Sequence, residues 1–279
     1  MITGFNDTSA VGRFGPLRTA EVWFDESLSC PVDIVHFRHV NRPIAGTRCT
    51  AEYTLDIDLT ANSEALVGAI KERTRTAIHR AERDEVVTNF WRRPDDTVLR
   101  ELCIFYNQFA QQKRLPPINQ AQLRTLLQSG ILSISNAVAP SGEVLVWHSY
   151  VCAHQRARLL HTASLFRNCC SSTQRNAIGR ANRYLIFKDM LAFKSIGLRV
   201  YDFGGWYEGS ENIELLRINQ FKQEFGGTIE IGYHCELALT PLGKCAVMLK
   251  RTKRNLASML FALSPWLFES EKTGKPGTR

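Results

Sequence analysis

Two aromatic blocks that each end in a glycine pair constrain the fold of this chain more than any other feature. They read Tyr201-Asp202-Phe203-Gly204-Gly205 and Phe221-Lys222-Gln223-Glu224-Phe225-Gly226-Gly227. Glycine adopts φ above zero without strain, and it lets a ligand or another segment approach the main chain closely. We therefore expect a short strand that ends at the first pair and a helix over 212–225 that ends at the second. The two blocks would then line opposite sides of one pocket.

Alternating and helical spacings of apolar residues predict the other elements. Strands are expected over 33–40, 51–59, 86–91, 131–138, 144–153, 157–164, 200–203 and 228–239. Helices are expected over 63–83, 94–109, 119–128 and 178–196, with a polar loop at 167–176 and irregular structure over 1–20. The predicted fold class is α/β (α+β), a mixed sheet with an antiparallel meander and helical crossovers.

Composition and charge are typical of a soluble globular chain that favours anionic partners. Of 279 residues, 44% are hydrophobic and 22% are charged, and the formal net charge is +8. A positive balance favours nucleic acid, nucleotide phosphates or anionic lipid as partners, although it also serves plain solubility. The start of the chain has no basic region followed by an apolar one, and no apolar run is long enough to span a bilayer. We expect a cytoplasmic protein.

The cysteines are scattered along the chain, at positions 30, 49, 103, 152, 169, 170, 235 and 245. They form no Cys-x-x-Cys pair, and no histidine follows them at the spacing of a zinc site. Because no secretion signal precedes them, all eight are expected to be reduced thiols. No metal site is predicted.

Three motifs resemble the Fem-type aminoacyltransferase branch of the GNAT acyltransferase superfamily. The basic stretch KERTRTAIHRAER at 71–83 is similar to the branch's helix pattern K-x-x-R-x-x-I-R-x-A-E. The block at 201–205 matches Y-D-F-G-G, and the block at 221–227 matches F-K-x-x-F-G-G. The order strand-strand-strand-loop-helix-strand-helix-strand, expected from 131 onward, is also that of GNAT-type enzymes.

The resemblance implies two GNAT-like halves and an amide-forming activity. An abbreviated N-terminal half over 21–130 would precede a complete transferase half over 131–245. A basic and apolar helix over 246–268 and a disordered tail over 269–279 would follow. Members of the branch move an aminoacyl group from aminoacyl-tRNA onto an amine, such as a cell-wall precursor or a natural-product amine, and no cofactor is implied. The coiled-coil arm of some members is absent from this sequence.

Lys222 and Asp202 are the candidate catalytic residues, because amide formation needs a stabilised oxyanion and a neutral amine. Lys222, between two phenylalanines, would project into a low-dielectric pocket where its charge acts strongly, or it would be a solvated helix lysine. The resemblance implies that it stabilises the reacting ester or the tRNA end. Asp202 would orient the amine or accept its proton, or it would cap the glycine loop. The donor-binding residues expected beside them are Tyr201, Phe221, Gly204 and Gly205.

The stretch QRNAIGRA at 174–181 is a second candidate for donor binding. GNAT enzymes that use acyl-CoA hold its pyrophosphate at a helix start with a pattern like Q/R-x-x-G-x-G/A. Here Gly179 fits that pattern, whereas Asn176 departs from it. Arg175 and Arg180 oppose the helix dipole unless an anion is bound. Tyr184 would share their face or pack in the core.

Three further features have both a binding and a structural interpretation. Arg75 belongs to the basic helix at 71–83, which would contact phosphates of a tRNA acceptor arm or simply face solvent. His148, in the middle of a strand, would be a base or a buried structural histidine. The basic and apolar run at 250–268 would contact an anionic membrane surface or RNA, or pack on the core.

The expected function is transfer of an aminoacyl group from aminoacyl-tRNA to a small amine or peptide acceptor. One alternative is an N-acyltransferase that uses acyl-CoA, the one case in which CoA would serve as cofactor. A second alternative is a non-catalytic module that binds RNA or lipid on a GNAT scaffold, since a fold does not fix a function.

Overall fold

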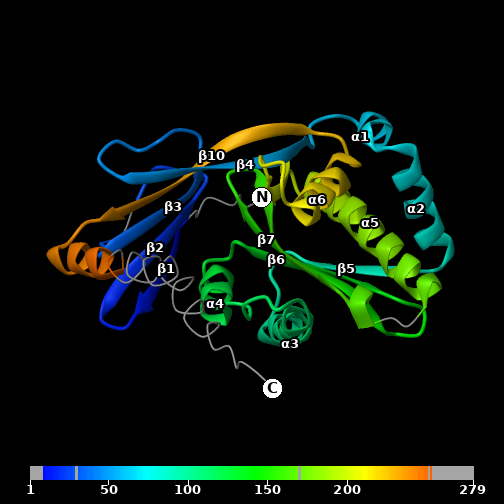
Figure 1. The fold of residues 1–279 in the computed structure, drawn as a ribbon, viewed down its shortest axis with the longest axis horizontal. Helices are drawn as coiled ribbons and strands as arrows, with labels where there is room; N and C mark the ends of the chain where they lie inside the picture. Colours follow the sequence, from blue (N-terminus) through cyan, green and yellow to red (C-terminus); the bar gives the residue numbers. More distant parts are fainter. Residues whose placement is uncertain (1–8, 29–30, 169–170, 251, 253–279) are drawn as a thin grey trace, which may run out of the picture.

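A ten-stranded mixed sheet runs through the molecule in a computed structural model that describes residues 9–28, 31–168, 171–250 and 252 (Figure 1). The strands are β1 (Ser9–Phe14), β2 (Leu17–Trp23), β3 (Ile34–Val40), β4 (Arg48–Asp58), β5 (Val87–Trp91), β6 (Leu132–Val138), β7 (Val144–Ala153), β8 (Arg156–Ser164), β9 (Val200–Gly205) and β10 (Thr228–Ala238). They lie in the order β1-β2-β3-β10-β4-β9-β8-β7-β6-β5. Pairing is parallel for β2 with β3 and for β8 with β9, and antiparallel elsewhere. The predicted fold class, an α/β mixed sheet with helical crossovers, is confirmed.

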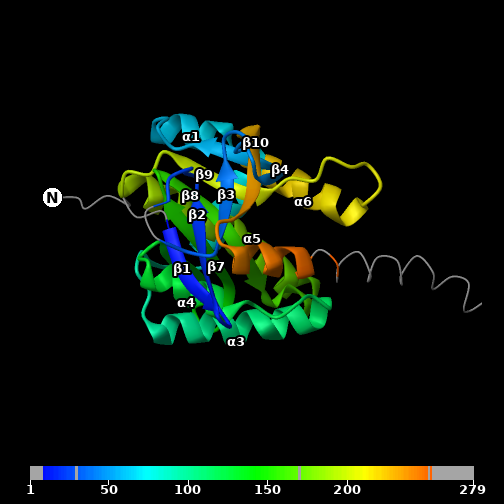
Figure 2. The same cartoon turned by 90° about the vertical axis from the view of Figure 1, so that its left-hand side faces the viewer.

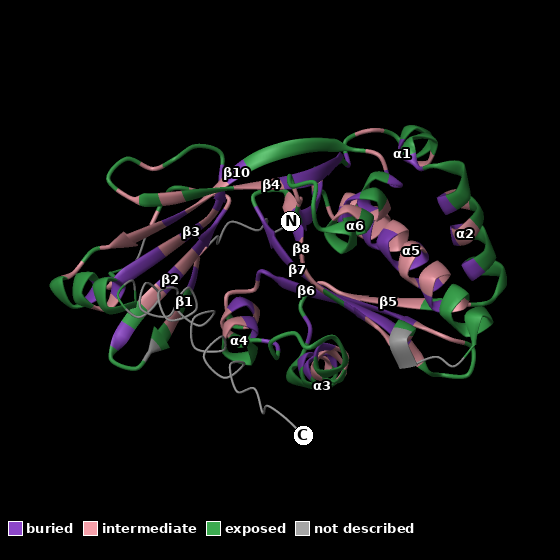
Figure 3. Cartoon of the chain, in the orientation of Figure 1, coloured by how far each residue is buried: buried purple, intermediate pink, exposed green. Residues whose placement is uncertain are grey.

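Helices cover both faces of the sheet. One face carries α1 (Ser63–Ala69), α2 (Glu72–Arg83), α5 (Ser172–Ser195) and α6 (Ile213–Gln223), and the other carries α3 (Asp96–Lys113) and α4 (Gln120–Gln128), as Figure 1 shows. A short 3-10 turn, η1 (Leu165–Asn168), leads from β8 toward α5. In the view of Figure 2, α6 and the loop before it project from the body of the molecule. The buried stripes of these helices, seen in Figure 3, enclose one core beside α2 and α5 and another beside α3 and α4.

Strands β8 and β9 separate toward their carboxyl ends. They pair in parallel only where Arg156–Arg158 lies beside Val200–Asp202. Beyond these residues β8 continues beside β7 as far as Ser164, while β9 follows β4, where Thr54 faces Gly205. Open α/β sheets place their ligands at the carboxyl ends of strands that separate in this way. The fold thus brings the first glycine block to such a position.

The predicted halves, 21–130 and 131–245, share one sheet, because β10 lies between β3 and β4. The boundary between the halves stays a prediction. Residues 241–250 form a helix after β10. The rest of the helix predicted over 246–268, apart from residue 252, and the predicted tail lie outside the described residues. Within the described part of the chain, no helix is long and apolar enough to cross a membrane.

The expectation of irregular structure over 1–20 is wrong for its described residues, which form the hairpin of β1 and β2. Gly15 turns the chain with a φ of +58°. Leu17, Ala20 and Val22 on β2 are buried. Glycine, arginine and threonine interrupt the apolar alternation in this stretch, so periodicity alone does not predict the strands.

The helix predicted over 63–83 is two helices, α1 and α2. Ile70, between them, is buried and extended, with φ −74° and ψ 130°. The backbone N–H of Lys71 donates to the carbonyl oxygen of Glu224 at 2.8 Å. A contact from the second glycine block therefore fixes the break, and local propensity cannot predict it.

Helix α5 begins earlier than predicted, which removes the second half of the loop expected at 167–176. Ser171 is its N-cap, and the hydroxyl oxygen of Ser171 accepts the backbone N–H of Gln174 at 3.1 Å. A serine cap of this kind is an ordinary helix-start signal. The first two turns of α5 are polar, so the spacing of apolar residues alone predicts a later start.

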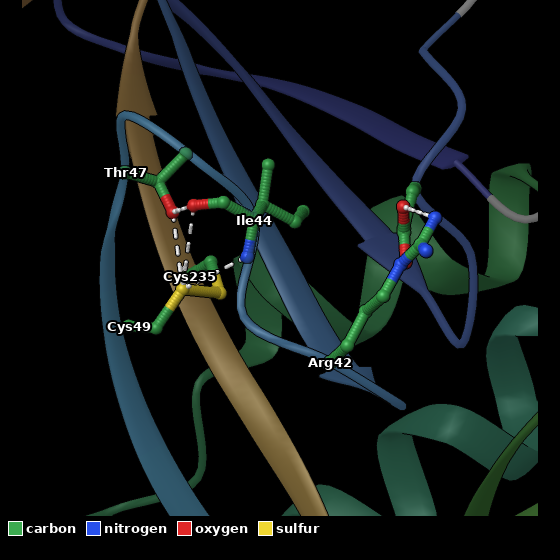
Figure 4. The surroundings of a disulfide bond; sticks show 6 residues. Arg42, Ile44, Thr47, Cys49 and Cys235 are labelled. Atoms are coloured by element: carbon green, nitrogen blue, oxygen red, sulfur yellow. Dashed lines mark hydrogen bonds and ion pairs between the residues drawn. A yellow bond between two sulfur atoms is a disulfide. The ribbon is translucent and has the colours of Figure 1, made fainter.

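A disulfide joins Cys49 on β4 to Cys235 on β10, which corrects the expectation of eight reduced thiols (Figure 4). The two cysteines face each other across the antiparallel pair. The hydroxyl oxygen of Thr47 lies 3.0 Å from the Cys49 sulfur. The cysteines are 186 residues apart in sequence, and only the register of the sheet brings them together. The free thiols among the described residues are Cys103, Cys152 and Cys245.

Candidate active site

Lys222 lies where the two glycine blocks meet. It belongs to the last turn of α6, whose first turn is capped by the side chain of Asn212. The Lys222 ammonium donates to the carbonyl oxygen of Gly204 at 3.2 Å and to that of Gly205. Only 9% of the residue's surface is exposed. Burial lowers the pKa of Lys222 to about 8, although the Asp202 carboxylate opposes the shift, so the side chain is a cation at neutral pH.

The glycines at the end of β9 shape this lysine site. Gly204 has a φ of +69°, and a Cβ atom there would lie 3.0 Å from the carbonyl oxygen of Leu159. The pairing of β9 with β4 shifts register beside it, and the resulting bulge turns two successive carbonyl oxygens toward one ammonium. An ammonium has three N–H groups. Within the described chain Lys222 uses two of them, so one remains to donate to a ligand.

Glu224, in the second block, is a site residue that sequence reasoning missed. Its buried carboxylate accepts the Thr74 hydroxyl at 2.7 Å, Nε of Arg183 at 3.1 Å and the guanidinium of Arg73. Burial raises the pKa of Glu224, but the Thr74 hydrogen bond and the Arg183 charge outweigh it and hold the pKa below its usual value. Glu224 thus ties α6 to α2 and α5. The motif F-K-x-x-F-G-G allows any residue at position 224, so the motif does not predict that Glu224 belongs to the site.

Asp202 is closed off from solvent, with 0% of its surface exposed. One carboxylate oxygen accepts the Gly204 N–H at 2.7 Å and the Thr54 hydroxyl. The other accepts Nη1 of Arg158 at 2.9 Å and Nη1 of Arg156 at 3.2 Å. Burial raises the pKa of Asp202, but the two guanidinium charges outweigh it and hold the pKa below its usual value. These contacts match the capping alternative, and they leave no surface through which Asp202 could touch an amine.

The two arginines that bind Asp202 also pair with other carboxylates. Nη2 of Arg158 donates to Glu52 at 2.5 Å, and Nε2 of His234 lies 2.6 Å from the same carboxylate oxygen. Nη1 of Arg156 donates to both oxygens of Asp56, at 2.8 and 2.7 Å. Burial and the neighbouring Asp202 carboxylate raise the pKa of Asp56 to about 6. Among the described residues, no group of histidines, cysteines and carboxylates is arranged to hold a metal ion.

Tyr201 faces α5, on the opposite side of the sheet from these charges. Its hydroxyl lies 3.1 Å from that of Tyr150, which donates to Asp189 at 2.6 Å. Nδ1 of His148 lies 2.9 Å from the same Asp189 oxygen, and its Nε2 lies 2.9 Å from the side-chain oxygen of Asn182. Tyr201 and His148 are fully buried. The structure therefore places both in a closed network rather than on a donor-binding surface.

The early start of α5 moves the predicted anion loop into a helix. Gly179 lies inside α5, beyond the first turn, so the expectation that it lines a pyrophosphate site at a helix start is wrong. Arg180 pairs with Asp84 at 2.7 Å. Tyr184 is buried in the core, as its structural alternative requires. Arg175 remains in the first turn and is exposed.

Arg75 and Phe221 are both engaged by neighbouring groups. Arg75 donates to the carbonyl oxygens of Ile70 and, at 3.5 Å, of Val67, so it closes the end of α1. The guanidinium of Arg183 lies 4.9 Å from the Phe221 ring centre. Basic side chains do face solvent along the predicted tRNA-binding helix; the exposed ones are Lys71, Arg73, His79, Arg80 and Arg83.

Comparison with known proteins finds similar folds among solved structures. No protein-family model matches the sequence, and no curated protein matches it. The crystal structure of FemX is similar, with a TM-score of 0.54 and 13% identity over 66% of this chain and 61% of FemX. The C-terminal domain of a protein named as a lysylphosphatidylglycerol synthetase, from Agrobacterium fabrum, has a TM-score of 0.50 and 12% identity over 87% of each chain. The chain thus spans about three fifths of FemX and shares its fold.

Proposed function

We propose that the protein forms amide bonds by moving an aminoacyl group from aminoacyl-tRNA to a small amine or peptide acceptor. The observation that carries the proposal is the Lys222 ammonium, buried at the end of β9 with one N–H unused by the described chain. The motifs that resemble Fem-type enzymes adjoin one another here, because Glu224 ties the second glycine block to the basic helix α2. Fold similarity to FemX and to the lysylphosphatidylglycerol synthetase domain supports the coarser part of the proposal, an aminoacyl transfer.

The reaction balances without a covalent enzyme intermediate. The amine nitrogen attacks the ester carbonyl carbon, which forms the C–N bond and places negative charge on the carbonyl oxygen. Lys222 donates its remaining N–H to that oxygen, in a site of low dielectric where the charge acts most strongly. The C–O bond to the tRNA ribose then breaks. The amine gives up one proton, and the ribose oxygen leaves as a hydroxyl after taking one.

In this proposal Asp202 is a positioning residue. It binds the Gly204 N–H and two arginines, and Gly204 in turn presents its carbonyl oxygen to Lys222. The acyl-CoA alternative has less support, since it depends on Gly179 at a helix start. CoA therefore has no part in the proposal.

Donor binding tests the class of donor. The full chain would be titrated with whole tRNA, with a non-hydrolysable mimic of the aminoacylated tRNA end, and with CoA, at about 50 and about 200 mM salt. We expect tRNA binding to weaken steeply with salt, because phosphate contacts release counterions, and we expect no CoA binding. Arg80→Glu on α2 should weaken tRNA binding, and Arg100→Glu, at an exposed position on α3, is the matched control.

Two results would contradict the proposal. CoA binding without tRNA binding would make acyl-CoA the donor. Equal losses from Arg80→Glu and Arg100→Glu would mean that tRNA responds to overall charge and not to the α2 surface.

A further inference from the structure

A cleft of about 450 Å³ lies at the opposite end of β9 from Lys222. Its walls come from the chain after β2, from β3 and the segments after β3 and β4, from the turn between β7 and β8, and from the start of β9. Segments from both predicted halves therefore meet in it. Clefts where separate parts of a chain meet are common ligand sites.

Unusual backbone conformations concentrate at this cleft. Six non-glycine residues of the described chain have φ in the left-handed region, and four of them line the cleft. These are Phe24, His39, His154 and Gln155, with φ of +62°, +55°, +44° and +60°. The other two follow the ends of α2 and α3, where this conformation is ordinary. His154 and Gln155 are the two residues of the hairpin turn between β7 and β8, where this conformation is also ordinary. Phe24 and His39 lie in neither setting; there the conformation is strained for a residue with a Cβ atom, and such strain clusters at ligand sites.

Contacts with Gly232 and Arg158 hold the side chain of His39, which lines the cleft. A Cβ atom at Gly232 would lie 2.3 Å from Nδ1 of His39, so the glycine makes room for the ring. Only 3% of His39 is exposed. Nη1 of Arg158 donates toward His39 Nδ1 at 3.2 Å. The cleft floor is therefore a built arrangement rather than a gap between loops.

Two guanidinium groups face the cleft with unused donors. Arg156 donates through Nη1 alone, which leaves its Nε and Nη2 without a partner in the described chain. Its guanidinium is held 5.6 Å from the ring centre of Phe24. Arg199 makes no side-chain hydrogen bond or ion pair with the described residues, while its backbone N–H is anchored by the carbonyl oxygen of Gln155 at 2.7 Å. Guanidinium groups with free N–H donors suit carboxylate and phosphate oxygens.

Asp58 is the acidic residue that lines the cleft. One of its oxygens accepts the Thr60 N–H at 2.8 Å and the Thr60 hydroxyl at 2.7 Å. The other oxygen has no partner in the described chain and is available as an acceptor. This carboxylate would weaken the binding of a bare anion to the two guanidinium groups without preventing it, whereas a ligand that also carries hydroxyl or amine donors would gain a hydrogen bond from it.

We propose that this cleft binds a small molecule with a carboxylate or phosphate group that also carries hydroxyl or amine donors. Arg199 and the free edge of Arg156 hold the anionic group, and Asp58 accepts a donor. The site is separate from Lys222 and does not depend on the proposed amide transfer. Asp202 connects the two places, since it accepts both from Arg156 and from the Gly204 N–H.

Isothermal titration calorimetry on the full chain tests this site with two probes, inorganic phosphate and succinate, in separate titrations at constant ionic strength. At least one anion should bind at a single site with a Kd in the millimolar range or below. Arg199→Gln should weaken binding about tenfold or more, because it removes a positive charge and its N–H donors from the cleft. Asp58→Asn should tighten it about threefold, because it removes a nearby negative charge and keeps an oxygen for Thr60. Arg100→Gln, at an exposed arginine on α3 outside this cleft, is the matched control and should change nothing.

Binding of phosphate alone would identify a phosphate ester as the ligand class, and binding of succinate alone a carboxylate. The proposal is overturned if neither anion gives saturable binding below about 50 mM, or if Arg100→Gln and Arg199→Gln lose the same affinity. Imidazole NMR signals of His39 and His154 in the unmodified protein provide a test that needs no variant. They should shift during the anion titration, and signals that stay unchanged would also overturn the proposal.

Discussion

Tyr201 and Asp202 are neighbours in sequence, yet they belong to two buried polar networks on opposite faces of one sheet. The Asp189 network is a set of hydroxyl, imidazole and amide groups around one carboxylate, and comprises Ser135, His148, Tyr150, Asn182, Asp189 and Tyr201. The Asp202 network is a set of paired charges, Glu52, Asp56, Arg156, Arg158 and Asp202, together with the neutral hydroxyl of Thr54. Both are closed to solvent at their centres.

The two networks differ in the parts of the molecule that they contact. The Asp189 network is enclosed between the sheet and α5, and its groups satisfy one another. The Asp202 network contacts the cleft at Arg156 and, through Gly204, the ammonium of Lys222. Buried polar groups therefore serve two purposes in this protein. One network specifies the packing of the core, and the other holds Arg156 at the cleft and Gly204 beside Lys222.

Loss of the Asp189 carboxylate should give the largest fall in stability. Asp189→Ala leaves the Ser135 and Tyr150 hydroxyls and the His148 ring without their shared acceptor. We expect the free energy of unfolding to fall by about 3–5 kcal/mol in urea titrations, while donor binding by the folded fraction is unchanged. Glu101→Ala, at an exposed position on α3, is the control and should change stability by less than about 0.5 kcal/mol. A loss at Asp189 no larger than the control's would remove the distinction between the networks.

Arg158→Met should give the second largest fall in stability, and it should also change the pKa of Lys222. It removes a cation shared by Asp202 and Glu52, and we expect a loss of about 3 kcal/mol in the free energy of unfolding. The Arg158 charge is one of the groups that lower the pKa of Lys222. An NMR titration of the Lys222 side chain should therefore show a higher pKa in Arg158→Met and no change in Asp189→Ala. The same Lys222 pKa in both variants would contradict an electrostatic connection between the Asp202 network and Lys222.

The disulfide should contribute to stability and not to the site. Replacing Cys49 and Cys235 by serine should lower the free energy of unfolding by about 2–4 kcal/mol, because the bridge restricts the unfolded chain. The wild-type protein in reducing buffer should unfold like this double variant. If reductant has no effect on the wild-type protein, the two thiols are not bridged in solution.

Tyr201→Phe should give the smallest effect. It removes one hydroxyl at the margin of the Asp189 network, while Tyr150 keeps its hydrogen bond to Asp189. Thermal unfolding should show a loss of about 1 kcal/mol, with unchanged donor binding. A loss of donor binding in a stable Tyr201→Phe protein would instead return Tyr201 to the donor pocket.

The glycine pairs predicted that the end of β9 and the end of α6 meet at the site. Gly204 and Lys222 lie in contact because the positive φ of Gly204 and the short helix after β9 are both local properties of the sequence. The strands of the second half were also predictable, since each has its own apolar run between turn residues.

The rest depended on contacts between distant segments. Glu224 breaks the helix at Ile70, Arg158 and Thr54 enclose Asp202, and the register of β4 with β10 pairs Cys49 with Cys235. No local pattern contains these partners. The motifs therefore predicted which residues lie near one another, whereas the pairing of distant strands decides which of them are exposed and which are buried.

The most direct test of Lys222 as a charged stabiliser is the ratio of transfer rates of the wild-type protein and Lys222→Met, measured from about pH 6.5 to about pH 9.5. The variant should remain folded, because burial already disfavours the charged lysine. Ionisation of the acceptor amine affects both proteins and cancels in the ratio. We predict a ratio of about 10²–10³ at neutral pH, which falls by about tenfold for each pH unit above about 8 as Lys222 loses its proton. A ratio near one at neutral pH, or a ratio that rises through pH 8, would contradict a role for Lys222 as the cation that stabilises the oxyanion.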